Sequence, residues 1–321
     1  LTVVATATSA QVEVGDLPFP EANELLHVQL ELRKAARLER SRAESNPFTE
    51  RCAACGQQPA AAPDPEPNRE GRLCRACLHR LQFSGRASLL PLDRIPAEDL
   101  TKVGDRARPQ GYLATVYLDL DRAGSFLRRE GKTLDAYSRL SKTMRDSVRG
   151  AVHAALETAV PTGRDGVAGY EVFLIGGDDA LVAVPADRFF VFLRAFQEKY
   201  HAAWDGQAHP SFSCGALLAH DKAPIVAVFR QAEEFLRSAK RMKNSDDAGL
   251  DPDNDTVDYA ISAGAVEDLL GERRAVQERG GGWSRTMKPY KIREVLGLTD
   301  GVAELRRAGA PANKSRQLYD I

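Results

Sequence analysis

The chain has 321 residues, of which 43% are hydrophobic and 28% charged, as in a folded globular protein with one large or two small domains. A formal net charge of −1 excludes attraction to nucleic acid or membranes by bulk charge, so any phosphate-binding surface must be local. No apolar run approaches the ~18 residues of a membrane span and no signal peptide is visible, so we expect a cytoplasmic protein without membrane contact. Because the first residue is Leu1, we also expect a piece of a longer protein or a processed chain.

Residues 1–48 form the first expected segment. The stretch LTVVATATSAQVEV reads as a strand, and a helix is expected from about Glu21 to Arg42. The charged side chains of this helix most simply form a solvated face, and contact with RNA is the alternative.

Four cysteines mark the next segment, residues 49–82. Cys52 and Cys55 form one C-x2-C pair, Cys74 and Cys77 form a second, and eighteen residues separate the pairs. This spacing predicts a structural zinc site closed by four thiolates, with two disulfides as the alternative. The fifth cysteine, Cys214, lies in a strand-like apolar run and is expected to be a buried small hydrophobe.

A proline-marked linker over 83–110 leads into residues 111–262, where the pattern changes. There the order strand, helix, hairpin, helix, strand, helix, strand predicts an α+β fold of the ferredoxin-like kind with helices on one face of the sheet. Glycines 280–282 precede a C-terminal helical segment within 263–321.

Carboxylates gather at the ends of two of these strands. Side-chain alternation puts Asp119 and Asp121 on one face of their strand, and Asp178 and Asp179 lie at the tip of the hairpin YEVFLIGGDDALVAVP. If the strand and the hairpin are neighbours, Asp119, Asp178 and Asp179 converge, with no basic residue near them in the sequence. Such an oxygen-donor set suits Mg²⁺ or Mn²⁺.

The residues around these acids suggest how a nucleotide could bind. Gly176 and Gly177 are expected to adopt positive φ in the turn and to let phosphates approach the backbone. Among the cations of EEFLRSAKRMKNS, Lys240 is the expected phosphate contact, and simple stabilisation of the helix C-terminus is the alternative. The acidic stretch 245–258 is expected to be a solvated loop, because a calcium loop starting at Asp251 would have Thr256 in place of its glycine and Ser262 in place of its glutamate.

These motifs together resemble a known family. DLDRAG at 119–124, IGGDDALVAVP at 175–185 and HDKAPIVAVFRQAEEFLRSAKRMKNS at 220–245 resemble the second palm domain of the large, polymerase-like subunit of type III CRISPR effector complexes. That subunit carries a four-cysteine zinc module upstream of this palm, and residues 286–321 resemble the segment that follows it.

The resemblance implies an enzyme that converts ATP to cyclic oligoadenylate in antiviral defence when target RNA is bound. It implies metal-binding and catalytic roles for Asp119, Asp178 and Asp179, with nucleotide contacts from a further set: Gly176, Gly177, Ser125 and Lys240. The implied partners are ATP, guide and target RNA held through other effector subunits, and either a first palm domain or a second copy of the chain. Residues 1–48 are a candidate for the end of that first palm.

Related diguanylate cyclases carry a guanine-reading asparagine after the strand motif. Ala123, Gly124 and Leu127 occupy the corresponding places here, which favours adenine. No nuclease is expected, because the one His-Asp pair, His220 and Asp221, lies within the palm without further ligands. Two other functions stay open: an inactive RNA-scaffolding subunit and a stand-alone homodimeric nucleotide cyclase.

Overall fold

The computed structural model describes residues 18–43, 50–56, 58–65, 71–82, 89–90, 94–161, 166–243, 254–264, 268–279 and 288–309. The strand expected at the start of the chain, glycines 280–282 and most of the acidic stretch before Asp255 lie outside these residues. The chain divides into two compact units, one made of 1–85 with 128–138 and the other of 86–127 with 139–321. We call them the cysteine unit and the sheet unit.

The cysteine unit contains one long helix and a small two-stranded sheet. Helix α1 (Phe19–Ala43) covers the span in which a helix was expected. Strands β1 (Ala62–Pro63) and β2 (Arg72–Leu73) pair antiparallel, and helix α2 (Arg75–Gln82) follows directly. The two Cys pairs therefore lie on either side of a short hairpin-like element.

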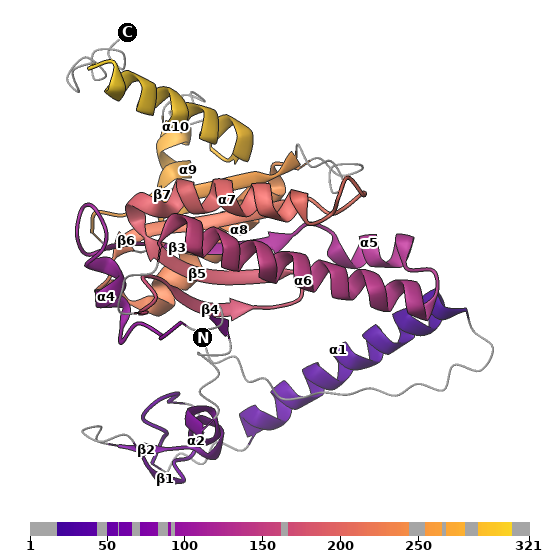
Figure 1. Ribbon diagram of the computed structural model, residues 1–321. Helices are drawn as coiled ribbons and strands as arrows, with labels where there is room; N and C mark the ends of the chain where they lie inside the picture. Colours follow the sequence, from indigo (N-terminus) through magenta and orange to yellow (C-terminus); the bar gives the residue numbers. More distant parts are fainter. Residues whose placement is uncertain are drawn as a thin grey trace. The chain divides into compact units, whose positions relative to one another are not determined.

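The sheet unit is built on six strands in the order β4-β5-β3-β6-β7-β8. Their bounds are β3 (Tyr112–Leu120), β4 (Glu171–Ile175), β5 (Asp179–Pro185), β6 (Phe212–His220), β7 (Thr256–Ile261) and β8 (Tyr290–Lys291). Among the neighbouring strand pairs of this sheet, β6 and β7 are parallel and the others are antiparallel. The expected α+β fold is confirmed, with β3 and β6 at the centre of the sheet (Figure 1).

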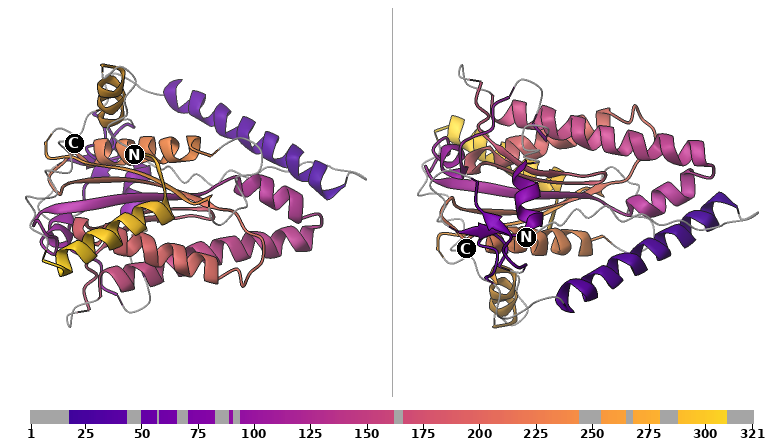
Figure 2. Two further views of the ribbon diagram at one scale, coloured as in Figure 1. Left: turned by 90° about the horizontal axis from the view of Figure 1, so that it is seen from above. Right: turned by 90° about the horizontal axis from the view of Figure 1, so that it is seen from below.

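Helices of the sheet unit cover both faces of the sheet, not the one face that the order of elements suggested. Their bounds are α4 (Leu100–Gly104), α5 (Ala123–Glu130), α6 (Leu134–Ala159), α7 (Phe189–Ala202), α8 (Ile225–Arg241), α9 (Leu269–Arg279) and α10 (Ile292–Arg307), with a short 3-10 turn η1 (Ala186–Arg188). Figure 2 shows α8 on one face and α6 with α7 on the other.

Residue alternation along β6 explains this two-sided packing. Leu217 packs with Phe235 of α8, whereas Phe212, five positions away and so on the opposite face, packs edge-on against Phe196 of α7 with ring centroids 4.9 Å apart. Both faces of the central strands are apolar, so each needs a helical cover.

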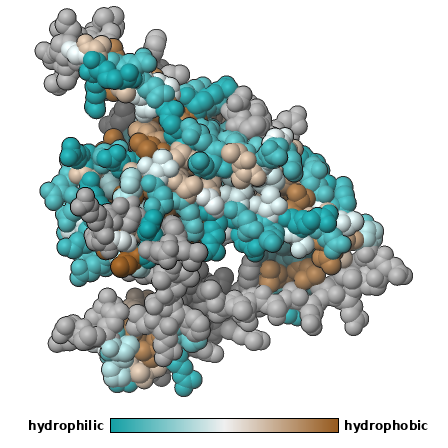
Figure 3. Space-filling view, in the orientation of Figure 1, coloured by the Kyte–Doolittle hydropathy of each residue, from teal (hydrophilic) through white to brown (hydrophobic). Residues whose placement is uncertain are grey.

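The surface of the sheet unit is predominantly hydrophilic on the face drawn in Figure 3, with hydrophobic residues in small separate spots. Among the described residues, no helix is both long enough and apolar enough to cross a membrane.

Gly215 of β6 sets how closely α8 approaches the sheet. A Cβ atom added there would lie 2.1 Å from the backbone nitrogen of Leu236 and 2.2 Å from the backbone oxygen of Ala232. Since both atoms belong to the α8 backbone, the helix would have to move away. We predict that Gly215→Val lowers the free energy of unfolding by ~3 kcal/mol or more, as overpacking of a tight core does, in urea titrations.

Gly150→Ala is the matched control. Gly150 lies in the exposed part of α6 with no atom within 4 Å of an added Cβ, so alanine should stabilise the helix by ~0.5–1 kcal/mol. Equal effects of the two substitutions would contradict the close approach of α8.

Candidate functional site

Strand register brings the predicted acids to one end of the sheet. Asp119 of β3 pairs with Asp179 of β5 on one side and with Ser213 of β6 on the other. Residues directly opposite each other point to the same face, so the two carboxylates share the face that α8 covers. Asp178 lies exposed at the hairpin tip, and its carbonyl accepts the Leu120 N–H at 2.9 Å.

Burial makes ionisation of the paired carboxylates unfavourable. It raises the pKa of Asp119 to about 6, although the hydrogen bond from Lys240 opposes the shift. Burial, together with the charge of Asp178, also raises the pKa of Asp179. The Tyr117 hydroxyl, whose pKa rises to about 12 mainly through burial, donates to Asp179 Oδ2 at 3.5 Å. A cation against this pair would offset the cost.

One such cation comes from the last turn of α8. Lys240 Nζ donates to Asp119 Oδ2, and its side chain remains 37% exposed. The expectation that these acids lack a basic neighbour therefore fails in space, and along the sequence Arg122 lies three positions from Asp119. Lys240, the expected phosphate contact, therefore lies next to the carboxylates.

A second lysine of the same region is bound to Asp121. Lys243 Nζ forms a buried ion pair with Asp121 Oδ2, and each side chain is only 7% exposed. The hydroxyls of Ser211 and Ser213 donate to the same carboxylate at 3.1 and 2.8 Å. The sequence placed Asp121 beside Asp119 without a role, and its partners mark it as a structural residue at the edge of the site.

The hairpin glycines do not adopt the backbone conformation that the sequence predicted. Neither Gly176 nor Gly177 has a positive φ. Instead, a Cβ added at Gly176 would lie 1.9 Å from Asp179 Oδ1, and nothing lies within 4 Å of one added at Gly177. Gly176 is therefore required by the close approach of the Asp179 carboxylate rather than by the turn.

The corner between β3 and α5 is bent sharply. Arg122 has φ +52°, a left-handed conformation that is uncommon outside glycine and is found at functional corners. The bend starts α5 directly beyond the carboxylates and leaves Ser125 exposed in its first turn. Ser125 thus lies on the element that follows the acidic strand.

The four cysteines of the cysteine unit form a compact cluster. Their Sγ atoms all lie within 4.8 Å of one another, and those of Cys55 and Cys74 are 3.9 Å apart. A disulfide needs ~2.05 Å, whereas the sulfurs of a tetrahedral zinc site with ~2.3 Å bonds are about 3.8 Å apart. Burial raises the pKa of the Cys52 thiol, but backbone N–H donors outweigh it and lower that pKa to about 6, whereas burial raises the pKa of Cys74 and, together with the neighbouring thiols, that of Cys77. Among the described residues, the three aspartates do not form so tight a group.

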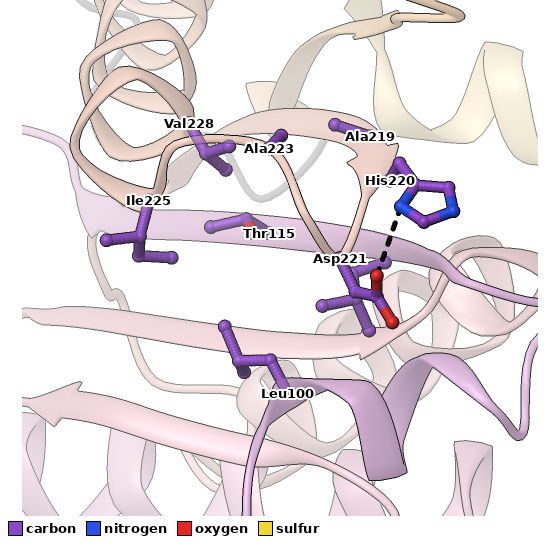
Figure 4. A pocket seen from close by; sticks show the side chains of 9 residues that line it. Leu100, Thr115, Ala219, His220, Asp221, Ala223, Ile225 and Val228 are labelled. Carbon is purple, nitrogen blue, oxygen red and sulfur yellow. Dashed lines mark ion pairs between the residues drawn. The ribbon is translucent and has the colours of Figure 1, made fainter.

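His220 and Asp221 lie at the opposite end of β6 from the acids. His220 Nδ1 and Asp221 Oδ1 are 3.0 Å apart beside a cavity of about 10 Å³ lined by Leu100, Ile225 and Val228 (Figure 4). His220 pairs with Tyr112 and lies eight positions along β6 from Phe212. In an extended strand, eight positions span ~26 Å. The pair is thus separate from the carboxylates. Cys214 is fully buried in the same strand.

The buried Asp121–Lys243 pair allows a stability test. We predict that Lys243→Met lowers the free energy of unfolding by ~3–5 kcal/mol, because it leaves a buried carboxylate without its cation. Adding Asp121→Asn should restore most of the loss. Arg237→Met, which removes an exposed ion pair with Glu233 on α8, should change stability by ~1 kcal/mol or less. Similar losses for the two single variants in urea unfolding would contradict a buried pair.

Part of the sheet unit matches a family model. Residues 112–248 match the model of the family described as Cas10/Cmr2, second palm domain. No curated protein matches the chain.

The chain is also similar to parts of solved structures. A Csm1-Csm4 cassette in complex with one ATP has 21% identity and a TM-score of 0.37, over 44% of this chain and 21% of that chain. A cassette in complex with cA4 has 18% identity and a TM-score of 0.43, over 70% of this chain and 37% of that chain. The chain therefore spans well under half the length of these proteins.

The matched segment runs from β3 to just beyond α8 and contains the GGDD hairpin, the acidic strand end and both lysines. The resemblance read from the motifs is confirmed for this segment: residues 112–248 form a second palm domain of the Cas10/Cmr2 family.

Proposed function

We propose that the palm domain catalyses metal-dependent nucleotidyl transfer from ATP and makes cyclic oligoadenylate, the activity that the family resemblance implies. The observation that carries the proposal is the pairing of Asp119 with Asp179 at the sheet end beside Asp178. As domain organisation we propose a palm over 111–262, a zinc module over 49–82, a linker over 83–110, the end of a first palm within 1–48 and a C-terminal helical segment over 263–321.

The donor set fits Mg²⁺ or Mn²⁺. Asp119 and Asp179 offer carboxylate oxygens, the ligand type these ions prefer, and burial makes both acids costly to ionise without a cation. Asp178 adds a third carboxylate at the exposed tip. When bound, such ions activate an attacking hydroxyl and stabilise a leaving pyrophosphate.

The remaining proposed roles belong to side chains of this domain. Lys240 is partly exposed next to Asp119, so its ammonium can turn to a triphosphate. Gly176 and Gly177 present bare backbone at the hairpin, and Ser125 offers an exposed hydroxyl at the start of α5. In this kind of chemistry, positioning and charge supply most of the catalysis.

We propose a structural zinc ion for Cys52, Cys55, Cys74 and Cys77. Four thiolates complete a tetrahedral shell and leave no position for substrate, so the ion would stabilise the cysteine unit and take no part in transfer.

The activity test needs ATP, Mn²⁺, RNA and the partner subunits together with this chain. We predict oligoadenylate products by mass spectrometry, and a loss of at least ~100-fold in Asp178→Ala/Asp179→Ala, as expected when electrostatic stabilisation is removed. Asp146→Asn, which changes an exposed acid on α6 paired with its neighbour Arg145, should keep activity. No product from the unaltered protein would favour the RNA-scaffolding alternative.

The zinc test uses metal content. We predict one zinc per chain in the unaltered protein. Cys74→Ser should lose the ion and should also lose the protection of the 50–82 region from proteolysis, because structural zinc supplies folding free energy. Cys214→Ala, at a buried cysteine outside the cluster, should keep the ion. Full zinc content in the Cys74 variant would rule out the four-thiolate site.

A further inference from the structure

An imidazole pair, of which His209 is buried and His201 is 23% exposed at its side chain, lies beside the palm site and has no part in the proposed chemistry. His201 is near the end of α7, His209 lies in the connection to β6, and Asp255 immediately precedes β7. The Asp255 residue is 1% exposed and His209 is 6% exposed. The three side chains form one continuous hydrogen-bonded chain.

Its links are short and well defined. His201 Nε2 lies 2.7 Å from Asp255 Oδ2, and His201 Nδ1 lies 2.7 Å from His209 Nε2. At the far end, His209 Nδ1 lies 2.9 Å from the carbonyl oxygen of Gln207. Both ends of this chain are oxygen atoms.

Counting protons along this chain fixes its charge. A carboxylate and a carbonyl oxygen only accept, so each end requires an N–H from an imidazole, and the contact between the rings requires a third. Two neutral imidazoles carry two N–H protons in total. With Asp255 ionised, the three hydrogen bonds form together only if one ring is an imidazolium.

The surroundings decide which ring is charged. Burial lowers the pKa of His209, whose ring stacks on Trp204 at 5.5 Å and 15°. His201 is the ring that touches the carboxylate. We propose that His201 is an imidazolium at neutral pH, donating to Asp255 and to neutral His209, and that this partly buried cation positions Asp255 at the end of the sheet.

The other titratable groups around the pair are already engaged. Tyr200 on α7 donates its hydroxyl to the Pro210 carbonyl at 2.8 Å. Lys243 beyond α8 and Asp121 beyond β3 bind each other. In the part of the chain that the structure describes, Asp255 is the carboxylate bonded to the pair, so it supplies the compensating charge.

Asp255 connects this cation to the palm site. Its Oδ1 accepts the Phe212 N–H at 3.0 Å, and the Phe212 carbonyl accepts from Lys243 Nζ at 3.0 Å. Lys243 in turn binds Asp121, two residues beyond Asp119. His201 is thus a positioning residue: it holds Asp255, which fixes the start of β6 where Lys243 and Asp121 meet. This role does not depend on the reaction proposed for the palm.

The direct test is a ¹⁵N spectrum of the full chain labelled at histidine, at pH 7. We expect imidazolium nitrogens for His201 and a neutral ring protonated at Nδ1 for His209, with His201→Gln and His209→Gln used for assignment. Two neutral rings in the unaltered protein would overturn the proposal.

Asp255→Asn sharpens the test, because an asparagine amide can donate to His201 Nε2. The chain then needs only two protons, so both rings should be neutral at pH 7. Asp205→Asn removes an exposed charge nearby, at a residue with φ +45° that asparagine tolerates, and should leave His201 charged. A charged His201 in the Asp255 variant would contradict the proton count.

Positioning is tested by amide hydrogen exchange. In His201→Gln, exchange at Phe212 should accelerate at least ~10-fold, the effect of about 1.4 kcal/mol on local opening. His27→Gln, at an exposed position of α1, should leave it unchanged. Unchanged exchange in the His201 variant would overturn the positioning role.

Discussion

The antiparallel register of β3 with β5 is the constraint on which the site depends. It sets Asp119 opposite Asp179, so that two like charges share one face at one end of the sheet. A slip of one residue would turn one of these carboxylates to the opposite face, toward α6 and α7. The close α8 packing over Gly215 and the bare backbone of Gly176 both serve this arrangement, since the first fixes the helix that carries Lys240 and the second leaves room for the Asp179 carboxylate.

Charge balance explains the rest of this end of the palm. Four aspartates gather there, Asp119, Asp121, Asp178 and Asp179, and the end of α8 supplies two lysines. The two lysines differ in kind: Lys243 is buried and saturated by Asp121, one hydroxyl and one carbonyl, whereas Lys240 is partly exposed and bound to one acid. The buried lysine maintains the structure, and the partly exposed one is the phosphate contact that we propose.

Sequence patterns were sufficient to predict the local features of the structure. Apolar runs predicted the strands and helices, alternation placed Asp119 with Asp121, and paired C-x2-C spacing predicted the cysteine cluster. What the sequence could not supply are contacts between distant residues: Lys240 is 121 positions from Asp119, and Lys243 is 122 from Asp121. The second helical layer was missed because element order does not say on which side of a sheet a crossover passes. Gly176 was assigned a turn role because a clash with Asp179 is visible only once the strands are paired.

Binding of Mn²⁺, followed by electron paramagnetic resonance on the full chain with a non-hydrolysable ATP analogue, tests most directly whether the paired carboxylates form a metal site. The account predicts bound Mn²⁺ in the unaltered protein and its loss in Asp119→Asn and in Asp179→Asn, with binding retained in Asp146→Asn. Equal Mn²⁺ binding in all four proteins would contradict it, because the ion would then lie somewhere other than the strand pair.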